Sequence, residues 1–278
     1  MLINALRFIR FSHTVFALPF ALGAMLVAAG GRPGWRLLGL ILLAMVFART
    51  AAMVFNRLAD WEMDKRNPRT EARHRLLPRP AAIGLLLISA GAFVATTWFI
   101  NFLCFVLSPV ALLVVFFYSL TKRFTHGAQF FLGLALSVSP MGAWFAVTGA
   151  WAWTPCLLAL AVLVWVAGFD TIYATQDHDF DRAEGLHSIV VALGVPRALV
   201  LAKVLHLVAF AALAAFGWAA GLRLPFWIGL APIAGALVYE HRSAARLDTG
   251  AINRAFFLSN AFVGVVFVAS IAIDVLTR

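Results

Sequence analysis

Long apolar stretches run through the whole chain, and short polar segments separate them. A helix needs about 20 mostly apolar residues to cross a bilayer. The pattern therefore predicts an all-α membrane protein in which residues 1–278 form a single domain of nine spanning helices. The expected limits of these helices, to within roughly two to four residues, are 12–30, 37–55, 81–100, 103–121, 128–149, 155–175, 198–220, 225–240 and 255–275.

The composition agrees with a membrane protein. Hydrophobic residues make up 63% of the chain and charged residues only 12%, whereas soluble domains carry roughly 25% charged residues. A net charge of +10 could indicate nucleic-acid binding, but the basic residues are spread between apolar runs, as membrane topology requires. The first run could also be read as a signal peptide, but it is long for one and many equal runs follow. We expect a lipid bilayer, and no nucleic acid, as the surroundings of this chain.

The placement of Lys and Arg predicts an orientation. Of the 22 Lys and Arg residues, 17 lie in the N-terminus, in the polar segments 56–80, 122–127, 176–197 and 241–254, or at Lys203 just inside the seventh predicted helix, and the opposite side carries four. Because loops rich in Lys and Arg stay in the cytoplasm, the first side is expected to be cytoplasmic. The N-terminus would then lie inside and the C-terminus outside.

A polar motif follows the second apolar run. Asn56, Asp60 and Asp64 are spaced four residues apart, so a helix would stack them on one face, about 6 Å apart along its axis. Like charges at this spacing repel each other, so helix packing alone gives no reason for the arrangement. The motif indicates a cation site, and Mg²⁺ takes carboxylate and amide oxygens of this kind.

A second acidic cluster follows the sixth apolar run. Asp170, Asp177 and Asp181 share a helical face, and Tyr173 lies near it. Asp179 is two residues from both Asp177 and Asp181, so we expect it to point into solvent.

The two acidic clusters are expected on the same side of the membrane. Nine of the twelve Asp and Glu residues lie in 60–71 or 170–184. Hydrated loop charges are the alternative interpretation, but ionisable groups are expensive next to hydrocarbon, and the two clusters have matched spacing. We therefore expect them to form one metal–diphosphate site.

Basic residues near both clusters could bind a diphosphate, for example through the planar fork of Arg, although topology alone also predicts basic loops. Arg49 differs, because it lies inside the second apolar run, seven residues before Asn56 and on the same helical face. We expect it to point into the same cavity and contact a substrate anion or an acceptor carboxylate, with pairing to an acid such as Asp170 as the alternative. The other candidates are Arg69, Arg73, Lys122 and Arg123.

These motifs resemble those of the UbiA superfamily of intramembrane prenyltransferases, over essentially the whole chain. The matching stretches are NRLADWEMDKRNPRTEAR (56–73), YSLTKR (118–123) and DTIYATQDHDFDRAEGLHS (170–188). The NRLxD and NPRT forms and the FSHTVFALPFALGAM opening look most like bacterial 4-hydroxybenzoate polyprenyltransferases and the menaquinone enzymes of the futalosine route. Arg57 departs from the many relatives that have an acid there, and Arg73-His74-Arg75-Leu76 departs from the more usual R-P-L.

The resemblance implies a bundle of nine transmembrane helices around a central cavity, in the inner (cytoplasmic) membrane with the active site facing the cytoplasm. It also implies roles for individual residues. Catalysis would involve Asp60, Asp64, Tyr173, Asp177 and Asp181, and Mg²⁺ would bind to Asn56, Asp60, Asp64, Asp177 and Asp181. The diphosphate would contact Arg69, Arg73, Lys122 and Arg123, and the acceptor would contact Arg49 and Asp170.

The function implied is Mg²⁺-dependent transfer of a polyprenyl group from a polyprenyl diphosphate to an aromatic acid, 4-hydroxybenzoate first, in ubiquinone or menaquinone biosynthesis. The donor would ionise to an allylic cation, and the ring would attack it by electrophilic aromatic substitution, with Asp177 activating the phenol. A dihydroxynaphthoate is the alternative acceptor. Haem O synthase is a further alternative, but the chain has no clear axial-ligand pattern. An ion- or proton-coupled transporter is the alternative of another class, although transporters place ionisable groups near the bilayer midplane, not at helix ends.

Overall fold

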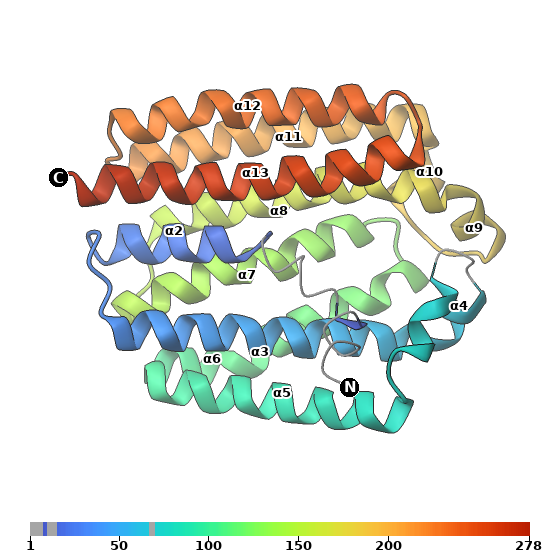
Figure 1. The fold of residues 1–278 in the computed structure, drawn as a ribbon, viewed down its shortest axis with the longest axis horizontal. Helices are drawn as coiled ribbons and strands as arrows, with labels where there is room; N and C mark the ends of the chain where they lie inside the picture. Colours follow the sequence, from blue (N-terminus) through green and yellow to red (C-terminus); the bar gives the residue numbers. More distant parts are fainter. Residues whose placement is uncertain (1–7, 10–15, 67–69) are drawn as a thin grey trace.

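The computed structural model describes residues 8–9, 16–66 and 70–278, without the side chains of Arg73 and His74. Seven helices in this part of the chain are long and apolar enough to cross a membrane. They lie side by side along the long axis of the molecule (Figure 1). Their bounds are α3 (Trp35–Ala59), α5 (Arg79–Ile100), α6 (Phe102–Phe117) with η3 (Tyr118–Arg123), α7 (Ala128–Thr148), α8 (Trp153–Ala174) with η4 (Thr175–Asp177) and α9 (His178–Ala183), α11 (Val195–Ala219) and α13 (Thr249–Leu276).

Two predicted segments coincide with helices outside this set of seven. The helix α2 (Leu18–Ala28) covers only 11 residues of the first segment, and residues 12–15 of that segment lie outside the described part. The helix α12 (Leu224–Ala244) is long enough, but Glu240, His241 and Arg242 lie near its end. A bundle of nine spanning helices therefore stays a prediction.

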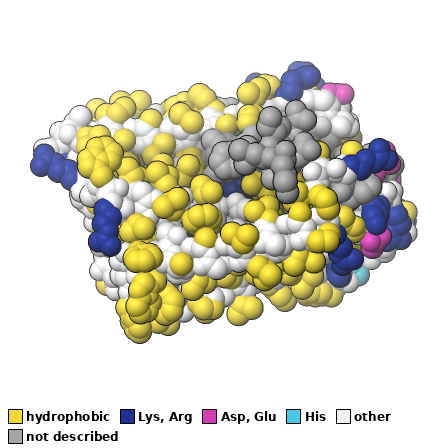
Figure 2. All heavy atoms as spheres, turned by 60° about the horizontal axis from the view of Figure 1, so that its bottom comes forward, with side chains coloured by type: hydrophobic (Ala, Val, Ile, Leu, Met, Phe, Trp, Pro, Cys, Tyr) yellow, Lys and Arg dark blue, Asp and Glu magenta, His cyan; other side chains and the backbone are white. Residues whose placement is uncertain are grey.

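The short helices gather at one end of the bundle. There α4 (Trp61–Arg66), η2 (Glu71–Arg75) and α10 (Ile189–Leu193) lie with α9, and the C-terminus lies at the opposite end (Figure 1). Both acidic clusters are thus at the same end, as the sequence predicts. Charged side chains collect at the two ends, and apolar side chains cover most of the flank between them (Figure 2). This is the surface of a protein embedded in a membrane.

Asn101 alone connects α5 to α6. Its side chain accepts a hydrogen bond from the backbone N–H of Cys104 at 2.8 Å, which caps α6, and Asn is among the favoured N-cap residues. Its Nδ2 also donates to the carbonyl of Phe145 in α7 at 2.8 Å. The predicted tight hairpin is therefore present, and the same residue ties it to α7.

Candidate functional site

The two acidic clusters meet around one pocket of about 200 Å³ at the end of the bundle that carries α4 and α9. The end of α3 and α4 form one wall, the segment from α8 to α9 forms the facing wall, and η3 lies between them. Every acidic or amide side chain assigned to the site from the sequence lines this pocket. These residues are Asn56, Asp60, Asp64, Asp170, Asp177 and Asp181, and Tyr173 lines it with them.

Backbone hydrogen bonds keep the first cluster in helical register. The N–H of Asp60 donates to the carbonyl of Asn56 at 3.0 Å, and the N–H of Asp64 donates to the carbonyl of Asp60 at 2.7 Å. The spacing of four therefore continues across the junction of α3 and α4. Nδ2 of Asn56 also donates to Oδ2 of Asp60 at 3.3 Å. The three side chains are presented together, as the spacing predicts.

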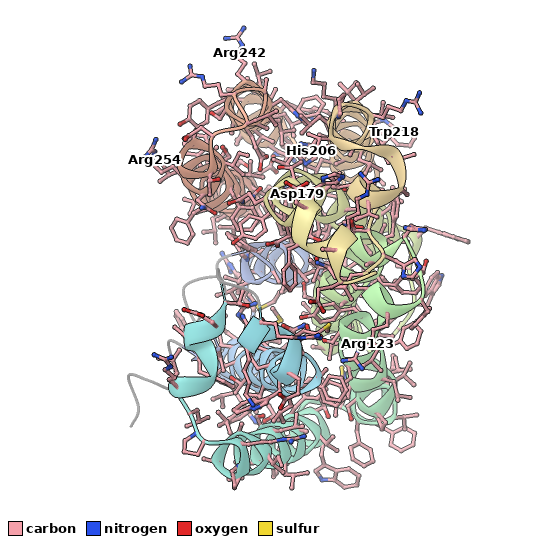
Figure 3. All side chains as sticks on the ribbon, turned by 90° about the vertical axis from the view of Figure 1, so that its right-hand side faces the viewer. Arg123, Asp179, His206, Trp218, Arg242 and Arg254 are labelled. Carbon is pink, nitrogen blue, oxygen red and sulfur yellow. The ribbon has the colours of Figure 1, made fainter. Side chains whose placement is uncertain are left out.

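The second cluster lies where α8 gives way to η4 and α9. Asp177 and Asp181 are 8% and 3% exposed. Asp179 is fully exposed, and its Oδ1 lies 2.9 Å from Nδ1 of the neighbouring His178 (Figure 3). The prediction that Asp179 points into solvent is confirmed. The side-chain period was sufficient here, because Asp177 and Asp181 line the pocket whereas Asp179, between them in sequence, does not.

The segment η3 brings two predicted cations to the acids. Nζ of Lys122 lies 3.4 Å from Oδ2 of Asp181, and Lys122 lines the pocket. Arg123 is exposed beside the pocket (Figure 3), where its Nη2 lies 3.7 Å from Oδ1 of Asp60 and donates to the carbonyl of Ala59. Each cation therefore touches a different wall, and η3 bridges the two acidic clusters.

Arg57 belongs to the site, although the sequence marked it only as a departure from related chains. It is 6% exposed and lines the pocket. Its Nη1 lies 3.5 Å from Oδ2 of Asp64 and donates to Oδ1 of Asn56 at 3.5 Å, while Nε donates to the carbonyl of Phe8. A buried guanidinium needs a partner, so an Arg directly after the motif Asn was a usable signal.

Burial and a neighbouring carboxylate raise the pKa of Asp60. Desolvation, and then the neighbouring charge of Asp64, raise the pKa of Asp60 to about 6, although Arg123, Lys122 and Arg57 act in the opposite direction. Of the residues that the structure describes, five carboxylates line the pocket, and two cations, Arg57 and Lys122, line it with them. The pocket thus favours a further cation.

The donor set fits Mg²⁺, a hard cation that prefers oxygen ligands. No three acidic, His or Cys side chains of the described residues are already grouped as a metal cage. Mg²⁺ does not need one, because it usually takes one or two carboxylates and completes its shell with waters and phosphate oxygens. The residues therefore fit a metal shared with a phosphate ligand better than a closed structural metal site.

A larger cavity of about 630 Å³ adjoins this pocket, and Tyr118 and Leu132 line both. Residues of α3, α5, α6, α7 and α8 make its walls mostly apolar. Arg49 is the only charged side chain among the described residues that line it. Arg49 thus lines this cavity and is not among the residues that line the acidic pocket, and its contact with an acceptor stays a prediction. Seven residues place Arg49 about 10 Å deeper along α3 than Asn56, beyond the boundary at Tyr118.

Two predicted diphosphate contacts fall on parts that the structure does not describe. Arg69 lies outside the described residues, as does the side chain of Arg73, so their roles stay predictions. Around this gap, Oγ1 of Thr70 donates to the carbonyl of Asp64 at 3.1 Å. Nη2 of Arg66 lies 3.0 Å from Oε2 of Glu184, which links α4 to the segment after α9 outside the pocket.

Comparisons with known proteins agree with this geometry. The model of the UbiA prenyltransferase family matches residues 17–261. A 4-hydroxybenzoate octaprenyltransferase of Vibrio campbellii is 31% identical over 257 residues, covering 90% of this chain and 88% of the relative. The apo structure of a UbiA homolog from Aeropyrum pernix K1 superposes with a TM-score of 0.86 at 30% identity, covering 94% of this chain and 98% of the other. A UbiA homolog from Archaeoglobus fulgidus bound to DMAPP and Mg²⁺ has the same fold, with a TM-score of 0.69 at 18% identity, covering 95% and 99%.

Proposed function

The chain belongs to the UbiA prenyltransferase family, and from that premise we propose that it transfers a polyprenyl group from a polyprenyl diphosphate to 4-hydroxybenzoate. The observation that carries the proposal is the single pocket lined by both carboxylate clusters and by Lys122, next to an apolar cavity. The name of the Vibrio campbellii relative supports this acceptor. A dihydroxynaphthoate remains the second candidate, because it carries the same carboxylate.

In this proposal the protein lies in the inner membrane, with α2 and α12 completing a bundle of nine spanning helices. The pocket faces the cytoplasm, since the segments around it carry most of the Lys and Arg residues. The adjoining cavity holds the apolar donor chain. Its walls exclude water from the reacting carbon, and Tyr118 stands at the boundary between the diphosphate and the chain.

Both walls of the pocket contribute to binding the diphosphate, which is the leaving group. Asn56, Asp60 and Asp64 on one wall and Asp177 and Asp181 on the other would hold Mg²⁺, which neutralises charge on the departing diphosphate. Lys122, Arg57 and Arg123 supply hydrogen-bond donors to diphosphate oxygens. Arg69 and Arg73 are proposed to add donors from the segment between α4 and η2.

The transfer breaks the C–O bond of the donor, and its electron pair leaves with the diphosphate. The ring carbon ortho to the phenol of the acceptor then bonds to the allylic cation, and the ring proton passes to a carboxylate or diphosphate oxygen. We assign phenol activation to Asp177. Asp170 and Tyr173 line the same pocket and orient the acceptor.

One assay tests the proposed function directly. Membranes that contain the protein are incubated with Mg²⁺, a polyprenyl diphosphate and either 4-hydroxybenzoate or a dihydroxynaphthoate, and the products are identified by mass spectrometry. Prenylated 4-hydroxybenzoate is the expected product. Product from the naphthoate alone would reassign the acceptor, and no product from any aromatic acid would favour the transporter alternative.

Arg49→Met is expected to raise the KM for 4-hydroxybenzoate by about a hundredfold and to change the donor KM only slightly. Arg49 is the charged group on the wall of a mostly apolar cavity, and its loss would leave the acceptor carboxylate unpaired there. Steady-state kinetics with each substrate varied separately measure the effect. Arg49→Lys keeps the charge and should recover part of the affinity. An unchanged acceptor KM in Arg49→Met would contradict this role.

Arg57→Gln is expected to raise the donor KM by about tenfold to a hundredfold. The change removes a buried cation beside Asp64 and Asn56, so the diphosphate meets a more negative pocket. The matched control is Arg66→Gln, which removes an exposed cation paired with Glu184 outside the pocket and should change the donor KM little. If both changes raised the donor KM equally, Arg57 would act only through the net charge of the protein and not through its place in the pocket.

A further inference from the structure

Three exposed cations lie away from the acidic pocket, on the first half of α11 and around the end of α12: Lys203, Arg242 and Arg246. Within the described part of the chain, none of them is within ion-pair distance of a carboxylate. The cations beside the pocket differ, since Arg57, Lys122 and Arg123 each have an aspartate partner. The α11–α12 cations are therefore available to an external anion.

The two carboxylates closest in sequence to Arg242 and Arg246 have other hydrogen-bond partners. Glu240 is buried at 1% exposure, and Nδ2 of Asn260 donates to its Oε1 at 3.4 Å. Asp248 caps α13 by accepting a hydrogen bond from the N–H of Ala251. Neither carboxylate neutralises the exposed cations.

A contact between two histidines shows which residues of α11 lie next to which residues of α12. Nδ1 of His206 and Nε2 of His241 are 2.9 Å apart, and Figure 3 shows His206 inside the bundle and Arg242 pointing away from it. Lys203 lies about 4.5 Å from His206 toward the start of α11, and Arg242 follows His241 toward the end of α12. Because the start of α11 and the end of α12 are at the same end of the molecule (Figure 1), Lys203 and Arg242 lie at the same level.

Exposed apolar side chains continue this surface toward the middle of the bundle. Val204 and Leu207 follow Lys203 along α11, and Val238 and Tyr239 precede Arg242 on α12. On α12 the apolar stretch ends in Arg242, and on α11 Lys203 lies between the exposed Val200 and the exposed Val204 and Leu207. A lipid molecule at a membrane interface has the matching order, with acyl chains below a phosphate.

We propose that Lys203, Arg242 and Arg246 bind the headgroup of an anionic phospholipid at the α11–α12 boundary. Basic groups between transmembrane helices can hold anionic headgroups in this way, and Arg forms charge-assisted hydrogen bonds with phosphate oxygens. The adjacent apolar side chains select a lipid over a free phosphate, because they give the acyl chains a surface to contact. The site is separate from the pocket proposed for catalysis.

Lipid binding to the purified full-length protein in detergent tests this proposal without using any prenyl substrate. Native mass spectrometry compares phosphatidylglycerol with phosphatidylcholine, and thermal unfolding is followed with each lipid and with inorganic phosphate. The protein is expected to bind phosphatidylglycerol in preference, and Lys203→Gln/Arg242→Gln should weaken that binding by about tenfold or more. The control Arg32→Gln/Arg223→Gln removes two exposed cations at the opposite end and should bind the lipid as the unchanged protein does.

Arg246→Gln alone is the second variant, since Arg246 follows the end of α12 and its loss disturbs no helix. It should weaken phosphatidylglycerol binding by a smaller factor. Equal lipid affinity of the Lys203/Arg242 variant and the control would overturn the proposal. Equal binding of phosphatidylcholine, or the same stabilisation by inorganic phosphate, would also overturn it.

Discussion

Asp181→Ala should lower prenyl transfer by about a hundredfold to a thousandfold while the protein still inserts into the membrane. Asp181 is 3% exposed and belongs to the wall opposite Asp60 and Asp64. Its loss removes a carboxylate from the proposed metal site. It also removes a partner of Lys122, whose Nζ lies 3.4 Å from Oδ2 of Asp181 in the unchanged protein. Losing one group that stabilises developing charge commonly costs a factor of this size.

The matched control for this change is Asp179→Ala. Asp179 is two residues away on the same short helix, but it is fully exposed and points away from the pocket. Turnover in washed membranes, normalised to the amount of inserted protein, should be near normal for Asp179→Ala. Asp60→Ala should be as inactive as Asp181→Ala, because both walls are needed. Normal turnover in either Asp60→Ala or Asp181→Ala would refute the site built from two clusters.

The first acidic cluster could be predicted from the sequence because its geometry is local. A spacing of four is helical, and the backbone bonds from Asp60 to Asn56 and from Asp64 to Asp60 preserve it. The second cluster was placed correctly for the same reason, although η4 interrupts the helix between Asp170 and Asp177. Side-chain periodicity was therefore enough to find the acids that line the pocket.

The positions of the arginines could not be predicted in the same way, because they depend on segments distant in sequence. Arg57 is buried between Asp64 and the carbonyl of Phe8, which is 49 residues earlier. Arg49 lines the apolar cavity, whereas Tyr118 of η3 lines both that cavity and the acidic pocket. Helical periodicity gives the face of α3 on which Arg49 lies, but not what other helices place opposite it.

The helix limits could likewise be predicted where nearby polar residues set them, but the type of the last helical turn could not. Apolar length located α5 and α7 to within two residues, because the polar segments that end them are local. The 3₁₀ segment η3, which carries Lys122 and Arg123 to the two acidic walls, was not foreseen. Hydropathy reports that a segment is apolar, and it does not distinguish an α-helical last turn from a 3₁₀ turn.

Removing divalent metal ions should reduce transfer to below about 1% of its normal rate. Among the described residues, five carboxylates line the pocket beside the cations Arg57 and Lys122, and a diphosphate adds several negative charges. Without a metal ion these charges repel the donor and oppose the departure of the leaving group. The measurement is turnover after treatment with excess EDTA, followed by addition of Mg²⁺, which should restore the rate.

A second readout separates metal binding from catalysis. Mn²⁺ can replace Mg²⁺ as an oxygen-ligated ion, and its binding can be followed by electron paramagnetic resonance without any substrate. Asp60→Ala should bind Mn²⁺ at least about tenfold more weakly than the unchanged protein, whereas Asp179→Ala should bind it normally. Unfolding temperatures with and without EDTA show whether the fold survives metal removal. Full activity in excess EDTA, with the fold intact, would exclude the role assigned to the acids, because the carboxylates alone would then hold a diphosphate against their own charge.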